Sequence, residues 1–214
     1  MILFFYDCET TGLDPEHCAI HQLSGKISKD GKIVESFNYH IQPFEGADID
    51  LKALAVSEVT EAQIMAYTSE EEIYKELCLM LLKYVDPFAK DPDQKMVTVG
   101  YNNSGFDDEF LWWFFKRHSN TPPSPNYRQG FSKGNFFNKL LSLDMLQAAK
   151  LVVGPGKHDG LENFKLGTVA TYLGCLSINE GKLHDADFDI DTTINLFKYF
   201  YSNGYIKTFQ GNKD

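Results

Sequence analysis

Two alternating segments joined at Asp30-Gly31 constrain the fold of this 214-residue chain more than any other feature. Residues 19–28 and 32–42 alternate between apolar and polar side chains, as strands with one buried face do. An Asp-Gly pair between two such segments favours a tight hairpin, because both turn positions must adopt a positive φ. The apolar run Ile-Leu-Phe-Phe at residues 2–5 predicts a buried strand before them. We therefore expect the chain to open with a three-stranded antiparallel meander.

Helical segments and two short strands are expected after the meander. Residues 53–67 predict a short helix and a loop, and the segment SEEE at 69–72 is a capping box before apolar residues at helical spacing. The further predicted elements are strands at 96–101 and 140–143, and helices at 107–118, 144–151, 161–173 and 186–201. No repeat or linker divides the sequence, so we expect a single domain over residues 1–214. The expected fold class is α/β, with a mixed five-stranded sheet (the meander plus two short strands) flanked by helices on both faces.

The composition excludes several classes of protein. With 43% hydrophobic and 14% aromatic residues, the chain has enough apolar side chains to form a core. No window approaches the ~20 apolar residues of a membrane span, and no basic leader indicates a signal peptide. The four cysteines lack CxxC spacing, so we expect reduced thiols and a cytoplasmic protein without a membrane partner. The net charge of −10 argues against coating of duplex DNA, but not against an enzyme that grips a few nucleotides at one end.

Asp7 and Glu9 follow the first apolar run directly, in the segment YDCETTG at residues 6–12. In a strand, positions i and i+2 share a face, so both carboxylates point to the same side. Two like charges that close are unfavourable unless a cation or a shared proton offsets them. An Asx-type turn that closes the strand is the alternative, since Asp and Thr both favour one. From this segment alone, a metal site and a turn both stay open.

A second group of acids follows the fourth predicted strand, in the segment GYNNSGFDDEFL at residues 100–111. A Gly/Asn turn ends the strand, and Asp107 and Asp108 fall in the first turn of a helix. Acids there complement the helix dipole, which explains their presence. The dipole does not explain why they lie at the carboxyl end of a second central strand, where open α/β sheets hold their sites.

The third acidic segment is KLHDADFDIDTT at residues 182–193. A calcium loop counted from Asp185 fails, because its sixth position is Ile190 instead of Gly and its twelfth is Leu196 instead of Glu. An aspartyl nucleophile motif, D-x-D-x-T, matches residues 189–193 but should end an apolar strand near the start of a domain. A helix fits best, because apolar residues recur there at helical spacing.

His184 would then lie in the loop before this helix, and Asp189 about one turn inside it. An imidazole held near a carboxylate favours proton transfer, so we expect His184 to act as a general base. The other histidines are expected to make structural hydrogen bonds; they are His17, His21, His40, His118 and His158.

Together the three segments resemble the DnaQ-like DEDD exonuclease superfamily, in its DEDDh branch. They are similar, in the same order, to the motifs D-x-E-T-T-G, N-x-x-x-F-D-x-x-F-L and H-x-A-x-x-D, and Leu143-Asp144 is similar to a weaker signature. The Phe-Asp pairing of the second motif favours Asp107 over Asp108, which we expect to be either solvated or a charge at the start of the helix. The matching residues are Asp7, Glu9, Thr10, Thr11, Gly12, Asn102, Phe106, Asp107, Phe110, Leu111, His184, Ala186 and Asp189.

The resemblance implies a ribonuclease-H-like fold and 3′→5′ release of nucleoside monophosphates with two Mg²⁺ ions, which Mn²⁺ can replace. Carboxylate oxygens suit these hard cations, and two ions about 3.5–4 Å apart can stabilise the attacking and leaving oxygens. Asp7 would bridge both ions, with Glu9 and Asp189 completing the first site. Asp107 would serve the second ion, partly through water, and His184 would deprotonate the attacking water.

Substrate contacts follow from the same resemblance. Thr10, Thr11 and Leu13 would meet the terminal nucleotide, with Leu13 wedged against its base, although ordinary packing is an alternative for Leu13. Backbone N–H groups after Glu9, through Gly12, could bind the 3′-hydroxyl. Two residues of the second motif, Asn102 and Phe106, are further candidates for substrate binding.

Residues 116–139 contain five Lys or Arg and no Asp or Glu, with four aromatic residues interleaved. Cations that track phosphates and aromatic rings that stack on bases form single-strand-binding surfaces, so Arg128 and Lys133 are candidates for strand binding. A solvated loop whose aromatic residues fill the core is the alternative. The aromatic residues are Tyr127, Phe131, Phe136 and Phe137.

The expected partner is a single-stranded or frayed 3′ end, with DNA preferred. An RNA-trimming enzyme related to RNase T or oligoribonuclease and a polymerase proofreading subunit are the alternatives, and homodimerisation stays open. No obvious tail or linker for a polymerase is present, which favours a free-standing enzyme. A non-catalytic binding module would be expected to lack one of the four acids or the histidine, and all five are present.

Overall fold

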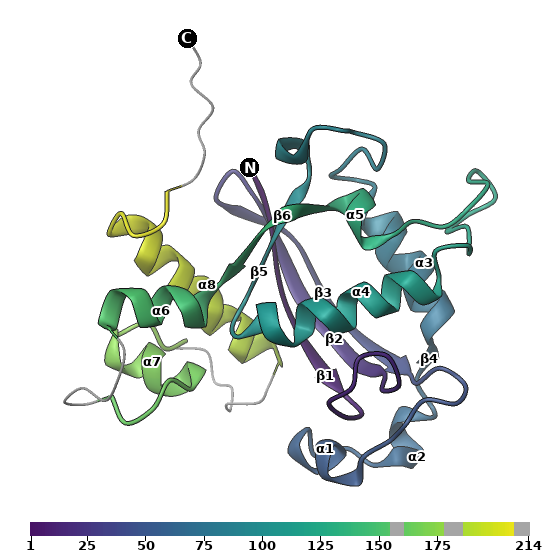
Figure 1. Ribbon diagram of the computed structural model, residues 1–214, viewed down its shortest axis with the longest axis horizontal. Helices are drawn as coiled ribbons and strands as arrows, with labels where there is room; N and C mark the ends of the chain where they lie inside the picture. The colour runs from purple at the N-terminus through teal and green to yellow at the C-terminus, as the bar shows by residue number, and fades with distance from the viewer. Residues whose placement is uncertain (155–160, 178–185, 208–214) are drawn as a thin grey trace.

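Six strands form one mixed sheet in the computed structural model, which describes residues 1–154, 161–177 and 186–207 (Figure 1). The strand order is β4-β3-β2-β1-β5-β6. The first three strands form the expected antiparallel meander, while β5 runs parallel to β1 and β6 parallel to β5. At the hairpin, Asp30 and Gly31 both have positive φ, 52° and 80°. The strands are β1 (Ile2–Thr10), β2 (Ile20–Lys29), β3 (Lys32–Gln42), β4 (Thr68–Ser69), β5 (Met96–Gly100) and β6 (Phe137–Asp144).

The α/β class and the mixed sheet flanked by helices are confirmed, and the expected number of five strands is one too few. The additional strand, β4, has two residues and pairs in parallel with the end of β3. Two residues are too few to produce a visible alternation. β6 is longer than expected because it bulges: Met96 and Thr98 of β5 pair with Phe137 and Ser142, so two steps along β5 match five along β6. The bulge breaks the period of two on which the sequence prediction depends.

Most helices begin and end within a few residues of their predicted bounds. The segment expected to hold one short helix holds two, and α7 starts five residues later than predicted, after Asn163 Oδ1 accepts from the Lys165 N–H in a turn. Two 3₁₀ turns, η1 (Pro92–Gln94) and η2 (Asn103–Gly105), flank β5. The helices are α1 (Leu51–Val56), α2 (Glu61–Ile64), α3 (Glu70–Leu81), α4 (Asp107–Arg117), α5 (Lys133–Phe136), α6 (Met145–Val153), α7 (Leu166–Tyr172) and α8 (Ala186–Ser202).

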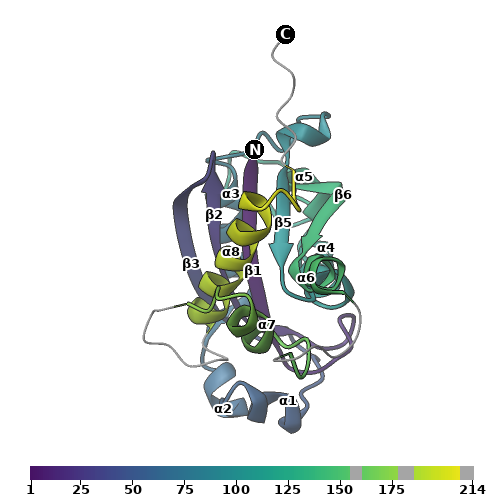
Figure 2. The same ribbon diagram turned by 90° about the vertical axis from the view of Figure 1, so that its left-hand side faces the viewer.

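Helices cover both faces of the sheet, and β1 contributes to both cores (Figure 2). Phe4 and Tyr6 pack with α3 and α4, while Leu3 and Phe5 pack with α6, α7 and α8. Full burial of one such side chain stabilises the fold by roughly 1.5–3 kcal/mol, so this run anchors β1 firmly. Asp7 and Glu9 continue the face of Leu3 and Phe5 because they follow in steps of two. Both carboxylates therefore lie on the side of the sheet that α8 covers.

Within the described residues, no helix is long and apolar enough to cross a membrane. The four cysteines are free and buried, as expected for reduced thiols.

Candidate active site

The end of β1 carries the first two acids into a turn. Glu9 pairs with Gln22 but Thr10 pairs with Ile20, so β2 has one extra residue at this point and the ladder bulges. Thr10 closes the turn by donating its hydroxyl to the Gly12 carbonyl over 2.8 Å. Because Thr10 makes the turn, the carboxylates of Asp7 and Glu9 do not have to close it.

Asp107 reaches this strand end from α4. Its Oδ1 accepts a 3.0 Å hydrogen bond from the backbone N–H of Cys8, the residue between Asp7 and Glu9. The side chain is only 6% exposed. One hydrogen bond thus brings Asp107 to the strand end that carries Asp7 and Glu9, although it bridges 99 positions of the sequence.

Asp144, at the end of β6, fixes the turn from which α4 starts. Its Oδ1 accepts from the backbone N–H groups of Asn102 and Leu146, both at 2.9 Å, and its Oδ2 accepts from the Ser104 hydroxyl at 2.7 Å. Asn102 needs this support because it adopts a left-handed conformation, with φ 63°. Asp144 therefore positions the turn and the first residues of α4, and the exposed Asn102 contributes through its backbone.

Asp108 is a charge in the first turn of α4, which is one of its two expected roles, and it is not the solvated acid of the other. Its carboxylate accepts hydrogen bonds from Tyr6 (2.9 Å), Ser142 (2.7 Å) and Asn103 (3.3 Å) and an ion pair from Lys133 (2.5 Å). It is 15% exposed. Since an ammonium and three neutral donors already satisfy it, Asp108 acts as a structural anchor of α4.

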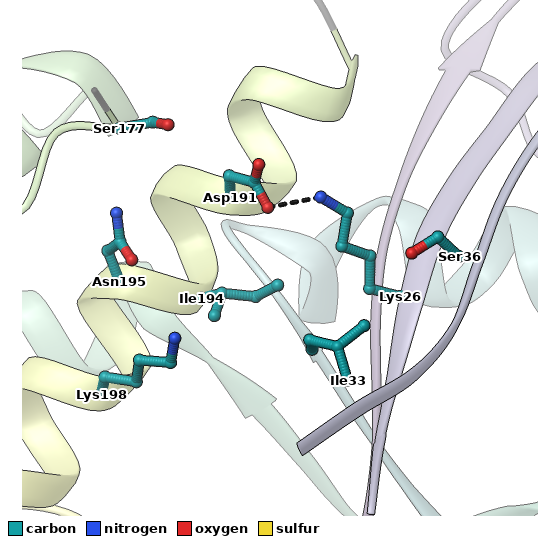
Figure 3. Close-up of a pocket in the computed structure, with 8 residues that line it drawn as sticks. All are labelled: Lys26, Ile33, Ser36, Ser177, Asp191, Ile194, Asn195 and Lys198. Atoms are coloured by element: carbon teal, nitrogen blue, oxygen red, sulfur yellow. Dashed lines mark hydrogen bonds and ion pairs between the residues drawn. The ribbon is translucent and has the colours of Figure 1, made fainter. Parts of the chain in front are cut away.

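Asp189 and Asp191 lie on different sides of α8. Two residues correspond to about 200° around a helix, and Asp191 pairs with Lys26 of β2 at 2.5 Å. That pair lines an open pocket of about 290 Å³ together with Ser36, Asn195 and other residues (Figure 3). Asp189 instead lies within electrostatic reach of Asp7. His184, the expected general base, lies outside the described residues.

Burial and mutual repulsion disfavour the ionised forms of two of these acids. The pKa of Asp7 is well above its ordinary value, through burial first and then through the charges of Asp107, Glu9 and Asp189. Burial raises the pKa of Asp107 to about 7, although hydrogen bonds from backbone N–H groups lower it in part. Clustered buried carboxylates with raised pKa values are a common property of functional sites.

The donor set suits a hard divalent cation, since all four acids offer carboxylate oxygens. A cation would also offset the repulsion that raises the pKa values of Asp7 and Asp107. As the side chains stand, no three carboxylate, imidazole or thiol groups in the described part of the chain are grouped as closely as metal ligands. Two of the acids are held by other donors: Asp107 by the Cys8 N–H and Glu9 by Ser57.

Ser57 is a residue of the candidate site that no sequence pattern indicates. Its hydroxyl donates to Glu9 Oε2 over 2.6 Å from the C-terminal end of α1. The two residues are 48 positions apart, and no motif links them.

The predicted substrate-binding residues at the turn differ in exposure. Thr11 is fully buried, donates its hydroxyl to the Asp48 carbonyl (2.7 Å) and accepts from the Ala19 N–H (2.9 Å). Its backbone is engaged as well, because the Thr11 N–H donates to the Ala19 carbonyl (2.9 Å) and the Thr11 carbonyl accepts from the Asp50 N–H (2.7 Å). Leu13 is 83% exposed, which excludes ordinary core packing for this side chain.

Two further candidates for substrate binding, Gly12 and Phe106, are packed within the fold. Gly12 is buried, and a Cβ there would lie 2.5 Å from Cys18 Sγ, so a larger residue would displace the turn. Phe106, at the start of α4, packs its ring against Phe110 with centroids 4.9 Å apart.

The prediction of a base-stacking surface in residues 116–139 is wrong, because the aromatic rings of this stretch fill the core. Phe131, Phe136 and Phe137 are buried, and Tyr127 packs against Phe131. The sequence alone does not distinguish aromatic rings that are buried in the core from aromatic rings that are exposed for stacking on a base.

The cations of that stretch are largely engaged within the protein. Arg117 pairs with the buried Glu70, Lys133 with Asp108, and Lys116 lies over the ring of Trp113. Arg128 is exposed, so of the two predicted strand-binding cations it is the more accessible.

Comparisons with known proteins show the family to which this chain is similar. The sequence profile of the exonuclease family RNase_T matches residues 4–197. A ribonuclease T of Histophilus somni is 25% identical over 92% of this chain and 82% of its own length. A PolC-type DNA polymerase III of Mycoplasmopsis pulmonis is 24% identical over 90% of this chain, which spans only 11% of the polymerase.

Among solved structures, exonuclease I of E. coli in complex with a dT13 oligonucleotide matches with a TM-score of 0.69. The match covers 94% of this chain and 41% of exonuclease I, at 21% identity, and it shows a shared fold. Members of the DEDD superfamily generally use divalent metal ions. The profile match extends from β1 into α8 and includes all four acids. The chain therefore belongs to the exonuclease family of the DnaQ-like DEDD superfamily.

Proposed function

We propose that this chain is a metal-dependent 3′→5′ exonuclease that releases nucleoside monophosphates from single-stranded or frayed DNA 3′ ends. The observation that carries the proposal is the hydrogen bond from the Cys8 N–H to Asp107, which brings a third acid to the Asp7–Glu9 strand end. Family membership supports hydrolysis of a terminal phosphodiester as the reaction.

Two divalent cations would be held by Asp7, Glu9, Asp107 and Asp189, with Asp7 shared between them. When bound, the cations would supply the positive charge that the attacking and leaving oxygens of the phosphodiester need. His184, in the segment before α8, would take the proton from the attacking water. Mg²⁺ is the proposed physiological ion, with Mn²⁺ able to replace it.

Asp107, and not Asp108, is the proposed ligand on α4. An ion pair with Lys133 already neutralises Asp108, whereas Asp107 accepts from neutral backbone N–H groups among the described residues and has a pKa raised by burial. Lys133 thereby enters the proposal as the partner of Asp108 and not as a contact to the strand.

The terminal nucleotide would lie against the turn after β1. The exposed Leu13 would pack on its base, and the backbone N–H groups of Thr10 and Gly12 would meet the 3′-hydroxyl, since the Thr11 N–H already donates to the Ala19 carbonyl. Asn102 and Phe106 would border the nucleotide from the start of α4, and Arg128 would contact a phosphate upstream.

A degradation assay tests this function. Single-stranded DNA labelled at its 5′ end is incubated with Mg²⁺ or Mn²⁺, and we expect a ladder of 3′-shortened products. Asp7→Asn, Asp107→Asn and His184→Ala should each abolish the ladder. Glu109→Gln is the matched control for Asp107→Asn, because Glu109 lies in the same helical turn but is exposed. Full activity of Asp7→Asn would overturn the metal scheme.

RNA trimming is the second candidate. The observation that favours it is the length of the match to ribonuclease T proteins, 82% and 76% of two relatives. The same assay with RNA of identical sequence separates the candidates, and a mismatched duplex in parallel tests a proofreading role. Faster single-turnover cleavage of RNA than of DNA would replace DNA as the proposed substrate.

A further inference from the structure

Ser57 is the one neutral side-chain donor recorded for the Glu9 carboxylate in the part of the chain that the structure describes. The hydroxyl lies 2.6 Å from Glu9 Oε2, a short distance that is typical of a hydrogen bond to a charged acceptor. The contact joins β1 to α1 and leaves Oε1 of the same carboxylate for another partner.

The N-terminal end of α1 is hydrogen-bonded to the turn that follows Glu9. The Asp50 N–H donates to the Thr11 carbonyl at 2.7 Å, and the Thr11 hydroxyl donates to the Asp48 carbonyl at the same distance. Asp50 also caps the helix by accepting from the Lys52 N–H at 2.9 Å. These bonds fix α1 relative to the strand end that carries Glu9.

The C-terminal end of α1 positions Ser57. The Val59 N–H donates to the Leu54 carbonyl at 3.1 Å, as in a Schellman motif. Glu58 occupies the left-handed position of that motif with φ 54°, where glycine is usual. Leu54 itself is buried and anchors the helix. Ser57 therefore follows a helix that is held in place at both of its ends.

Glu9 benefits from such a fixed donor more than the aspartates do. It has one more rotatable bond than an aspartate, and ordering a flexible side chain costs conformational entropy. Its charge also faces those of Asp7 and Asp107, which favour other orientations. A hydroxyl orients the carboxylate without adding a positive charge, whereas the Lys133 ammonium neutralises Asp108.

We infer that Ser57 is a positioning residue that orients Glu9 and thereby sets the affinity of the carboxylate site for divalent cations. The inference rests on the proposed function, because it takes Glu9 as a metal ligand. Donors that orient metal ligands typically change metal affinity by about 10–100-fold when they are removed.

Calorimetric titration of the metal-free full chain with Mn²⁺ tests this role. Ser57→Ala should bind Mn²⁺ about tenfold more weakly than the wild type, while Ser57→Thr, which keeps the hydroxyl, should retain most of the affinity. In Ser57→Ala, the Mg²⁺ concentration that gives the half-maximal single-turnover rate should also rise, and excess Mg²⁺ should recover the rate. Thr60→Ala is the control, since its hydroxyl bonds to Gln63 on α2. Melting temperatures establish that each variant is folded.

The outcomes separate this inference from the proposed function. If the wild type binds Mn²⁺ and shortens oligonucleotides but Ser57→Ala binds Mn²⁺ equally tightly, the positioning role is wrong and the proposed function stands. If the wild type binds no Mn²⁺, the proposed function itself fails, and the role of Ser57 fails with it.

Discussion

Asp107 links metal binding to stability through a single buried carboxylate. Burial raises its pKa from 3.8 to about 7, so the folded protein holds this proton more tightly than the unfolded chain does. The stabilisation from that proton is complete below the unfolded pKa and is lost as the pH rises through about 7. A bound cation would take over the role of the proton at higher pH.

The metal-free protein should therefore melt at a lower temperature at about pH 8 than at about pH 5. Over this range the Asp107 contribution falls by at most about 3 kcal/mol, since it changes by 1.36 kcal/mol for each pH unit between pH 5 and its pKa of about 7, which corresponds to several degrees. Calorimetric melting of the wild type and of Asp107→Asn checks this, because the variant cannot titrate and should lose much of the dependence. Equal pH dependence in both proteins would refute the assignment.

The sequence singles out the acids of the candidate site but not their partners. Asp7, Asp107 and Asp189 follow apolar runs or begin helices, which are local patterns. The engagement of Asp108 by Lys133 and of Glu9 by Ser57 depends on how distant segments pack, and no local pattern records it.

At the scale of elements, α5 holds the first turn of α4 in place. Lys133 at the start of α5 donates to both the carboxylate and the backbone carbonyl of Asp108. The two charged side chains are 16% and 15% exposed, so neither is well hydrated. Removal of the lysine would leave the carboxylate of Asp108 with neutral donors only.

Lys133→Ala should destabilise the protein by about 2 kcal/mol or more. Loss of one partner of a buried ion pair typically costs roughly 3–5 kcal/mol, and partial exposure reduces that value here. Arg128→Ala, from the same stretch but exposed, should change the unfolding free energy little. Urea unfolding measures both. A Lys133→Ala protein as stable as Arg128→Ala would show that the ion pair does not hold α4.

Elements with a regular period were predictable, and those without one were not. The hairpin at Asp30-Gly31 was found because the turn chemistry and the alternation of both strands agree. β4 is too short to show a period, and the bulge in β6 breaks its period. The aromatic residues of the 116–139 stretch lie in loops, in the four-residue α5 and at the first position of β6, where spacing does not indicate which rings are buried.

At the scale of the whole molecule, an acidic protein must bind a polyanion. The chain has 30 Asp and Glu against 20 Lys and Arg. Several cations are also engaged internally, among them Arg117 and Lys133. We therefore expect few phosphate contacts, and binding that depends mainly on the metal site and on the terminal nucleotide.

The affinity for single-stranded DNA should fall only shallowly with salt. Each neutralised phosphate contributes about 0.7 to the logarithmic slope for a single strand, so Arg128→Ala should reduce the slope by about that amount. Lys29→Ala is the control, because Lys29 pairs with Ile2 at the opposite end of β1 from Glu9. Fluorescence anisotropy in Ca²⁺, across a range of salt, measures the slopes. An unchanged slope in Arg128→Ala would remove Arg128 from the strand path.

The central claim is that the four acids form a site for two divalent cations, and counting the bound ions tests it most directly. Mn²⁺ is titrated into the full chain with thymidine 5′-monophosphate present, and free Mn²⁺ is measured by electron paramagnetic resonance. We predict two Mn²⁺ ions per wild-type chain, one per Asp107→Asn chain, and none at comparable affinity for Asp7→Asn, with Glu109→Gln unchanged. A wild-type chain that binds no Mn²⁺, or an Asp7→Asn chain that binds two, would contradict the account.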